Sequence, residues 1–226
     1  MLPSESIRNH SAGRSAPETP CLSVDSSFTE IEVWAEASGW DLDFRQLSAG
    51  RLNGRVRVLT GAHCTAMRVD LNQAYHQVGQ VSPDRLAFGL PHPSCGEFNW
   101  CRSRVEGGDI LNFNQEGGFD GTSGKSFSGC ALSFERKSLE ELAELLDLRV
   151  NLDELSHCGG TLSKASEETE RLRAQFALAF QRASKRASDG PLEASSLLGT
   201  GAAESILRLL ARSSGEQPRS VQPARR

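Results

Sequence analysis

Short runs that alternate between apolar and polar residues dominate the sequence from Trp40 to Phe134. The clearest run is Met67-Arg68-Val69-Asp70-Leu71. A period of two places successive side chains on opposite faces of a β-strand, so that one face is buried and the other meets water. Six further runs follow this pattern, at 40–44, 55–58, 85–90, 97–101, 109–113 and 130–134.

Turn-forming residues separate these runs. Glycine, proline, asparagine and aspartate are concentrated at 49–50, 53–54, 82–84, 107–109 and 117–118. These residue types are favoured in tight turns. Many short strands broken by turns are typical of a β-sandwich or a barrel of the jelly-roll type.

A helical spacing of apolar residues flanks the strand-rich region. Phe28, Ile31, Trp34 and Ala35 predict a short amphipathic helix over 28–38. After Phe134, the 3.6-residue period predicts three more helices: one with Leu139, Leu142, Ala143 and Leu146, one over 164–187, and one with Ile206, Leu207, Leu209 and Leu210. The predicted fold class is therefore α+β, with a jelly-roll β-barrel followed by C-terminal helices.

The two ends of the chain lack a core pattern. Residues 1–27 are rich in serine and proline, and residues 213–226 form a polar, basic tail. Both segments are predicted to be disordered.

Charge and hydropathy narrow the possible partners. The 226 residues include 25 basic and 29 acidic side chains, a net charge of −4. Without a dense basic stripe, the chain is a poor stand-alone nucleic-acid binder. No run approaches the roughly 18 apolar residues of a membrane span, and no secretory signal is present. We therefore expect no membrane partner, a cytoplasmic location, and reduced thiols at Cys21, Cys64, Cys95, Cys101, Cys130 and Cys158.

Cysteine and histidine spacing does not predict a metal site. The sequence has no C-x-x-C pair and no pair of histidines spaced as ligands. We interpret the cysteines as small buried residues and the histidines as loop or surface residues. Two alternatives stay open: a redox switch between Cys95 and Cys101, and a metal site built from His63, His76 and Glu97. No cofactor is predicted.

Motifs for catalysis are weak. The segment Gly121-Thr122-Ser123-Gly124-Lys125-Ser126 ends like a phosphate-binding loop, but Phe119 occupies the position of the first glycine and a strand pattern follows. We interpret it as a hairpin connection. No G-x-S-x-G nucleophile motif occurs, and the chain is predicted not to be an enzyme.

Aromatic and charged residues within the strands are candidates for a ligand pocket. Inward aromatic residues of a small barrel either form the core or line a cavity. A strand arginine either points outward or meets an anion or a carboxylate. The predicted ligand-binding residues are Trp40, Phe44, Arg68, Tyr75, Trp100 and Arg102.

Five stretches carry a resemblance to a known family. They are GWDLDFRQL at 39–47, GRLNGR at 50–55, PDRLAFGLP at 83–91, and GDILNF at 108–113 with GFDG at 118–121. With these motifs the region from Phe28 to Leu155 resembles the N-terminal sensor domain of AraC-family transcriptional regulators. The resemblance implies a cupin-like effector-binding barrel over 28–155 and a helical dimerisation region over 156–212.

The sequence departs from that family after Leu210. The family's two helix-turn-helix units have no counterpart in the short tail that remains. DNA binding is therefore expected only through a module absent from this chain. The chain could be a fragment, a truncated gene product or a natural stand-alone protein.

Taken together, these observations predict an effector-binding and dimerisation domain of a transcriptional regulator. A small-molecule effector would shift the population of two arrangements of the helices. We expect a homodimer whose seam is formed by Leu172, Phe176, Ala179 and Ala183, although the same stripe could pack on its own barrel. Two other functions stay open: a metal-dependent cupin enzyme, and a modulator that forms heterodimers with a full-length regulator.

Overall fold

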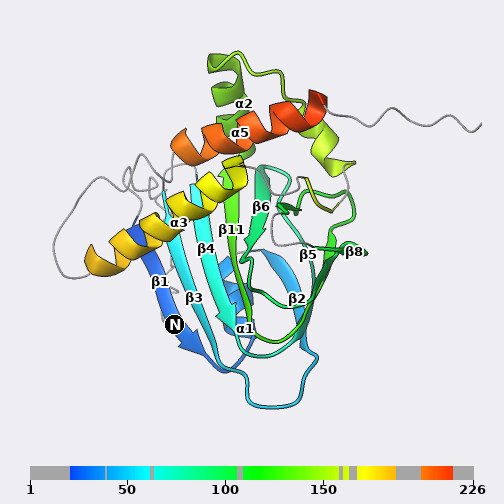
Figure 1. Ribbon diagram of the computed structural model, residues 1–226, viewed down its shortest axis with the longest axis vertical. Coiled ribbons are helices and arrows are strands. Elements are labelled where there is room, and N and C mark those ends of the chain that lie inside the picture. Colours follow the sequence, from blue (N-terminus) through cyan, green and yellow to red (C-terminus); the bar gives the residue numbers. More distant parts are fainter. Residues whose placement is uncertain are drawn as a thin grey trace, which may run out of the picture.

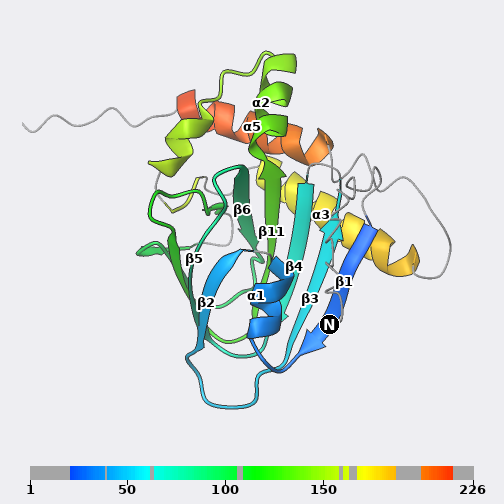
Figure 2. The same ribbon diagram turned by 180° about the vertical axis from the view of Figure 1, so that it is seen from behind.

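The fold consists of two antiparallel sheets and a group of C-terminal helices (Figures 1 and 2). A computed structural model describes residues 21–38, 40–61, 64–105, 109–157, 160–162, 167–186 and 200–215. Within these residues the predicted α+β class, a cupin-like barrel followed by helices, is confirmed. No helix in the described ranges is long and apolar enough to span a bilayer.

The larger sheet has six strands. In spatial order they are β1 (Cys21–Phe28), β3 (Gly54–Thr60), β4 (Cys64–Leu71), β11 (Phe127–Glu135), β6 (Arg85–Pro91) and β9 (Leu111–Asn112). The second sheet has five strands: β2 (Asp41–Gln46), β5 (Tyr75–Gln80), β10 (Phe119–Ser123), β7 (Phe98–Trp100) and β8 (Ser103–Arg104). The sheets face each other and enclose an aromatic core.

The central strands of the six-stranded sheet, β4, β11 and β6, are covered on both faces. Along β4, Met67 and Val69 face the barrel interior, whereas Ala66 belongs to a second core on the outer face. The alternation expected at 85–90 is wrong, because β6 is covered on both sides and its residues from Leu86 to Pro91 are all buried.

Helices cover the outer face of this sheet. They are α2 (Arg136–Leu145), the 3₁₀ turn η1 (Leu152–Ser156), α3 (Glu167–Arg186) and α5 (Thr200–Gly215). Figure 1 shows α3 crossing in front of β1, β3 and β4, with α5 above it. On the opposite side, α1 (Glu32–Ser38) lies between β2 and the six-stranded sheet (Figure 2).

The predicted disordered lead-in is wrong for residues 21–27. These residues belong to β1, which pairs with β3 along its length, and Asp25 forms an ion pair with Arg55 at 2.8 Å. Their serine-rich composition suggested disorder because it offers little apolar surface, but pairing with β3 supplies the missing stabilisation. Phe28 also ends this strand instead of starting a helix, so α1 begins at Glu32.

The predicted dimer stripe lies within the core of a single chain. Leu172, Phe176, Ala179 and Ala183 are 0%, 2%, 0% and 7% exposed, packed among the sheet's outer face and α5. The prediction that they form the seam between two copies is therefore wrong, and the alternative of packing on the chain's own barrel is correct. A helical apolar stripe specifies burial, but it does not specify whose surface buries it.

The segment interpreted as a hairpin connection links the two sheets instead. Strand β10 pairs with β5 and β7, while β11 pairs with β4 and β6. Residues 124–126 therefore cross from one sheet to the other, with Ser126 at a φ of 63°. A strand does follow this segment, as expected, and no helix begins there.

Gly121 provides a test of the packing between the sheets. A Cβ atom at this position would lie 2.7 Å from the ring of Trp100, which is fully buried. Gly121→Ala should therefore lower the free energy of unfolding by about 1–3 kcal/mol in urea titrations. Gly96→Ala is the matched control, because its Cβ would come no closer than 3.6 Å to another atom. Equal stabilities of the two variants would contradict this packing.

Candidate functional site

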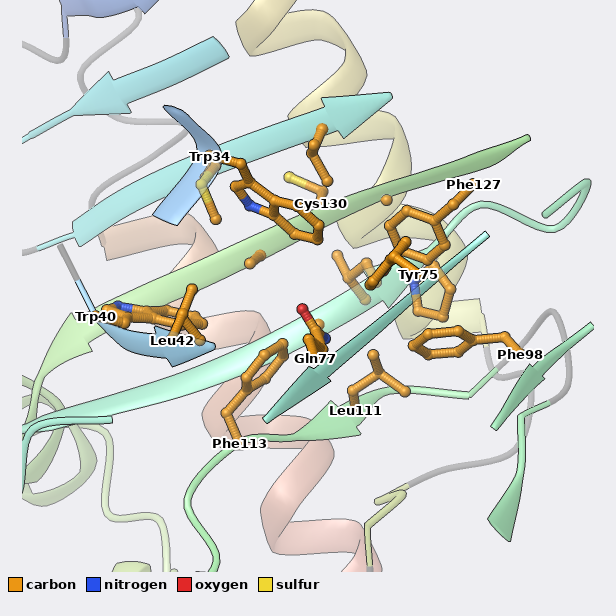
Figure 3. Close-up of a pocket in the computed structure, with 17 residues that line it drawn as sticks. Trp34, Trp40, Leu42, Tyr75, Gln77, Phe98, Leu111, Phe113, Phe127 and Cys130 are labelled. Carbon is orange, nitrogen blue, oxygen red and sulfur yellow. The ribbon is translucent and has the colours of Figure 1, made fainter. Parts of the chain in front are cut away.

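A cavity lies between the two sheets, at the side closed by α1 (Figure 3). Its volume is about 30 Å³, enough for one or two water molecules. The wall is mostly aromatic and aliphatic, and it includes Trp34, Trp40, Leu42, Tyr75, Gln77 and Phe113.

Local structure explains how these side chains reach the cavity. On β5, Tyr75 and Gln77 are two residues apart and therefore share the inner face, while His76 lies between them on the outer side. Trp34 comes from α1. Trp40 follows that helix directly, and its backbone N–H donates to Ser38 Oγ at 3.1 Å.

Trp34 of α1 closes one side of this cavity. Its indole is 5% exposed and packs against Phe44 and Tyr75, with ring centroids 4.4 and 5.1 Å apart. Tyr75 in turn meets Phe127 edge-on at 5.2 Å. Aromatic pairs of this kind contribute about 0.5–1.5 kcal/mol each beyond their buried area.

Two buried polar atoms at this site have no hydrogen-bond partner among the described residues. They are Nε1 of Trp34 and the phenol oxygen of Tyr75. Each unsatisfied group costs about 1–3 kcal/mol. Burial raises the pKa of Tyr75 well above its ordinary value and outweighs the smaller lowering effect of the nearby Ser123 hydroxyl, so the phenol stays neutral. The site thus offers two hydrogen-bond donors in an apolar enclosure.

Trp100 contrasts with Trp34. Its Nε1 donates to the backbone oxygen of Asn112 at 3.2 Å, and its ring stacks on Phe119 with centroids 5.0 Å apart. Trp100 is fully buried and does not border the cavity. Its role in the structure is to fill the core.

The structure brings only some of the predicted ligand-binding residues together. Trp40 and Tyr75 line the cavity, and Phe44 supports it from behind Trp34. Arg102 lies in the exposed turn between β7 and β8, with a φ of 68°. Arg68 is on the outer face of the six-stranded sheet, beneath α3. Neither arginine reaches the interior.

Sequence reasoning missed Trp34 and Gln77 as cavity residues. Trp34 was assigned to a helix, and nothing in a helical pattern indicates that one side chain enters a neighbouring barrel. Gln77 belongs to β5, whose sequence Tyr-His-Gln-Val-Gly-Gln contains few apolar residues. The spacing of Tyr75 and Gln77 could have indicated this, because residues two positions apart in a strand lie on the same face.

The metal and redox alternatives receive no support from the described residues. His76 lies 3.1 Å from Asp120 and Glu97 is exposed, while His63 lies outside the described residues. No group of three potential ligands occurs among the residues described. Cys95 and Cys101 are both free thiols, and burial raises the pKa of each. A raised pKa disfavours the reactive thiolate that a redox switch requires.

Comparison with solved structures finds this fold in a transcription regulator. The crystal structure of the AraC-like transcriptional activator CuxR matches with a TM-score of 0.53 and 11% sequence identity. The match covers 88% of this chain and 73% of CuxR. The chain has an AraC-like fold. Neither a family model nor a curated protein matches the sequence, so the likeness to CuxR is one of structure.

Proposed function

We propose that this chain is the effector-binding domain of an AraC-type transcriptional regulator, that it acts in the cytoplasm, and that it catalyses no reaction. The AraC-like fold supports this proposal, as does the position of the cavity between the two sheets. In this proposal, DNA is bound by a helix-turn-helix module other than the described residues.

The observation that carries the proposal is the pair of unpartnered donors on Trp34 and Tyr75. An uncompensated polar group persists in a buried site only at a cost in stability. A small, flat, mostly apolar molecule with a hydrogen-bond acceptor would satisfy both donors. This describes the chemical class of effector that the interior would take.

Room for such a molecule requires Trp34 to move. Helix α1 has only seven residues, and a helix this short is not stable without packing. Trp34 supplies that packing. An effector that moves the indole aside, and accepts a hydrogen bond from its Nε1 in the new position, would loosen the packing of α1 and shift the population towards an open arrangement, provided that it binds that arrangement more tightly.

Assembly into a homodimer is the second part of the proposal. The buried stripe on α3 is not available for it, but the same helix presents Leu178, which is 37% exposed. Sedimentation velocity of the whole chain over a range of concentrations measures the assembly directly. A monomer at high concentration would contradict this part of the proposal.

Fluorine NMR of the whole chain labelled with 5-fluorotryptophan tests effector binding. The three tryptophans should give three resonances, assigned by Trp34→Phe, Trp40→Phe and Trp100→Phe. A panel of small aromatic compounds, acids, amines and sugars is then titrated. A compound that enters the interior should shift the Trp34 and Trp40 resonances, which border the cavity, more than that of Trp100. A flat response to the whole panel would contradict the proposal.

A further inference from the structure

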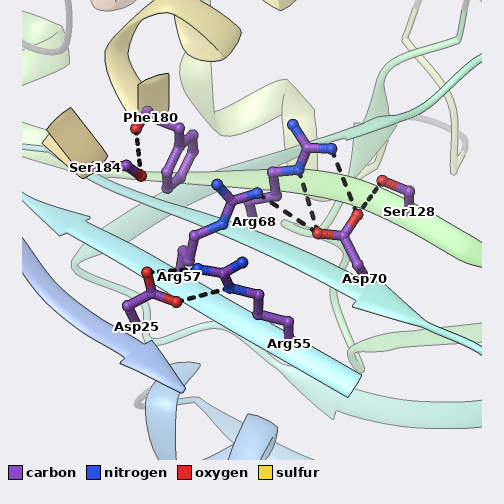
Figure 4. A network of polar contacts seen from close by, with 8 residues as sticks. All are labelled: Asp25, Arg55, Arg57, Arg68, Asp70, Ser128, Phe180 and Ser184. Carbon is purple, nitrogen blue, oxygen red and sulfur yellow. Dashed lines mark hydrogen bonds and ion pairs between the residues drawn. The ribbon is translucent and has the colours of Figure 1, made fainter. Parts of the chain in front are cut away.

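A second, larger cleft lies on the other side of the six-stranded sheet. It is bounded by the outer faces of β4, β6 and β11 and by α3, and its volume is about 330 Å³. Its polar wall includes Arg68, Ser128 and Arg173, and its apolar wall includes Phe176 and Phe180. Figure 4 shows the part of this region formed by β3, β4 and the start of β11.

Two arginines face each other directly at the floor of this region. Arg57 on β3 is the cross-strand partner of Arg68 on β4. Like charges in directly opposed positions destabilise a sheet. Both arginines form ion pairs with the same carboxylate, that of Asp70. Its oxygen lies 3.6 Å from Arg57 Nη2 and 3.4 Å from Arg68 Nε. The same carboxylate also accepts a hydrogen bond of 2.6 Å from Ser128 Oγ, so its capacity is divided among three groups.

A third arginine reaches the cleft from the helix. The side chain of Arg173 is 12% exposed; its guanidinium contacts Glu170 at 2.6 Å and donates to the backbone oxygen of Pro91 at 3.0 Å. The Nε atoms of Arg57 and Arg173 are buried without a hydrogen-bond partner among the described residues, and buried Arg68 Nε has only the 3.4 Å ion pair with Asp70. Arg68 and Arg173 line the cleft and Arg57 lies beside Arg68 on the next strand, so these incompletely satisfied donors point to a missing acceptor.

The local charge is unbalanced. The cleft region holds three guanidinium groups against the carboxylates of Asp70 and Glu170, which leaves one positive charge in excess. Arg55, which is next to this region, is already neutralised by Asp25 at 2.8 Å. His92 also borders the cleft, where its Nδ1 contacts Ser94 at 2.7 Å. A bound anion would restore the balance.

The apolar wall of the cleft indicates what the rest of the ligand is made of. Phe176 and Phe180 of α3 line it, and the guanidinium of Arg57 lies 5.6 Å from the centre of the Phe180 ring. We propose that this cleft binds a small organic anion with an apolar body. A carboxylate or phosphate accepts hydrogen bonds from Arg68 and Arg173, and the apolar body rests on the phenylalanines. Such a ligand joins α3 to the sheet, and it binds apart from the interior cavity.

Calorimetric titration of the whole chain with defined probes tests this proposal. The probes are 2-naphthoate, 2-naphthyl phosphate, inorganic phosphate and the neutral 2-naphthalenemethanol. Both naphthyl anions should bind at least about tenfold more tightly than inorganic phosphate and the neutral alcohol, because only they use both walls. The stronger of the two anions identifies the preferred head group. Equal binding of the neutral alcohol, or binding of no probe, overturns the proposal.

Arg68→Gln and Arg55→Gln form a matched pair for the same titration. Arg68→Gln should weaken the naphthyl anions about tenfold or more, while Arg55→Gln, which removes an already paired charge, should leave them unchanged. Without ligand, Arg68→Gln should unfold at the same or a higher temperature, because it removes the repulsion with Arg57. A destabilised Arg68→Gln variant that binds the anions normally would assign Arg68 a structural role and overturn the proposal. Neither outcome tests effector binding in the interior cavity, which is measured separately by the fluorine resonance of Trp34.

Discussion

Replacing Leu172 by glutamate should abolish folding of the chain. The leucine is fully buried between α3 and the core, so its loss removes about 1.5–3 kcal/mol of apolar burial. An unpaired carboxylate left in that core costs several kcal/mol more. The total is about 5 kcal/mol or more, comparable with the whole stability of many domains. Circular dichroism during urea unfolding measures the effect.

Leu178→Glu is the matched control, since it makes the same change on the same helix at a position that is 37% exposed. At a protein concentration where the wild type is monomeric, the stability of this variant should lie within about 0.5 kcal/mol of the wild type. A folded, monomeric Leu172→Glu protein together with a dimeric wild type would show that the stripe is an intermolecular seam after all, contrary to the packing described above.

Replacing Trp34 by alanine should cost about 3–5 kcal/mol and leave a cavity that indole can fill. The indole of Trp34 packs between Phe44 and Tyr75, and the free compound has the same shape. Indole at ten times its dissociation constant should return about 1.4 kcal/mol of stability to the variant. Urea midpoints with and without indole measure this recovery.

The wild type, whose cavity is already filled by Trp34, is the control for solvent effects of indole. Phe180→Ala is a second control, because it opens space in the separate outer core. Recovery by indole in the wild type, or equal recovery in Phe180→Ala, would show that indole does not act at the Trp34 site.

The strands with one apolar face were predictable from the sequence, and those without one were not. Strands β3 and β4 alternate over Arg55–Val58 and Met67–Leu71, so their existence followed from the pattern. Strand β1 is half polar and β5 has few apolar residues, and both depend on hydrogen bonds to their neighbours, which a one-dimensional pattern does not record. Tertiary pairing overrides weak local preference in such cases.

The candidate site was predictable in part for a similar reason. Tyr75 stood out because a buried phenol needs a partner, and Trp40 because it begins an alternating run. Trp34 depends on the docking of α1 against β2 and β3, a contact between distant segments. Arg68 does point outward from the barrel, as the alternative interpretation held, but α3 then covers it. Local sequence gives the face of a strand, whereas the cover over that face comes from elsewhere in the chain.

Strands β6 and β11 of the six-stranded sheet separate two compartments, and Leu90 of β6 borders both of them. Gly129 and Cys130 of β11 border the interior cavity and also the cleft under α3. The two spaces are therefore separated by the thickness of a single backbone. A displacement of β11 away from one compartment would bring it closer to the other, because the same strand borders both. A ligand bound in the cavity and a ligand bound in the cleft would therefore affect each other's binding directly through β11, without a longer chain of intervening side chains.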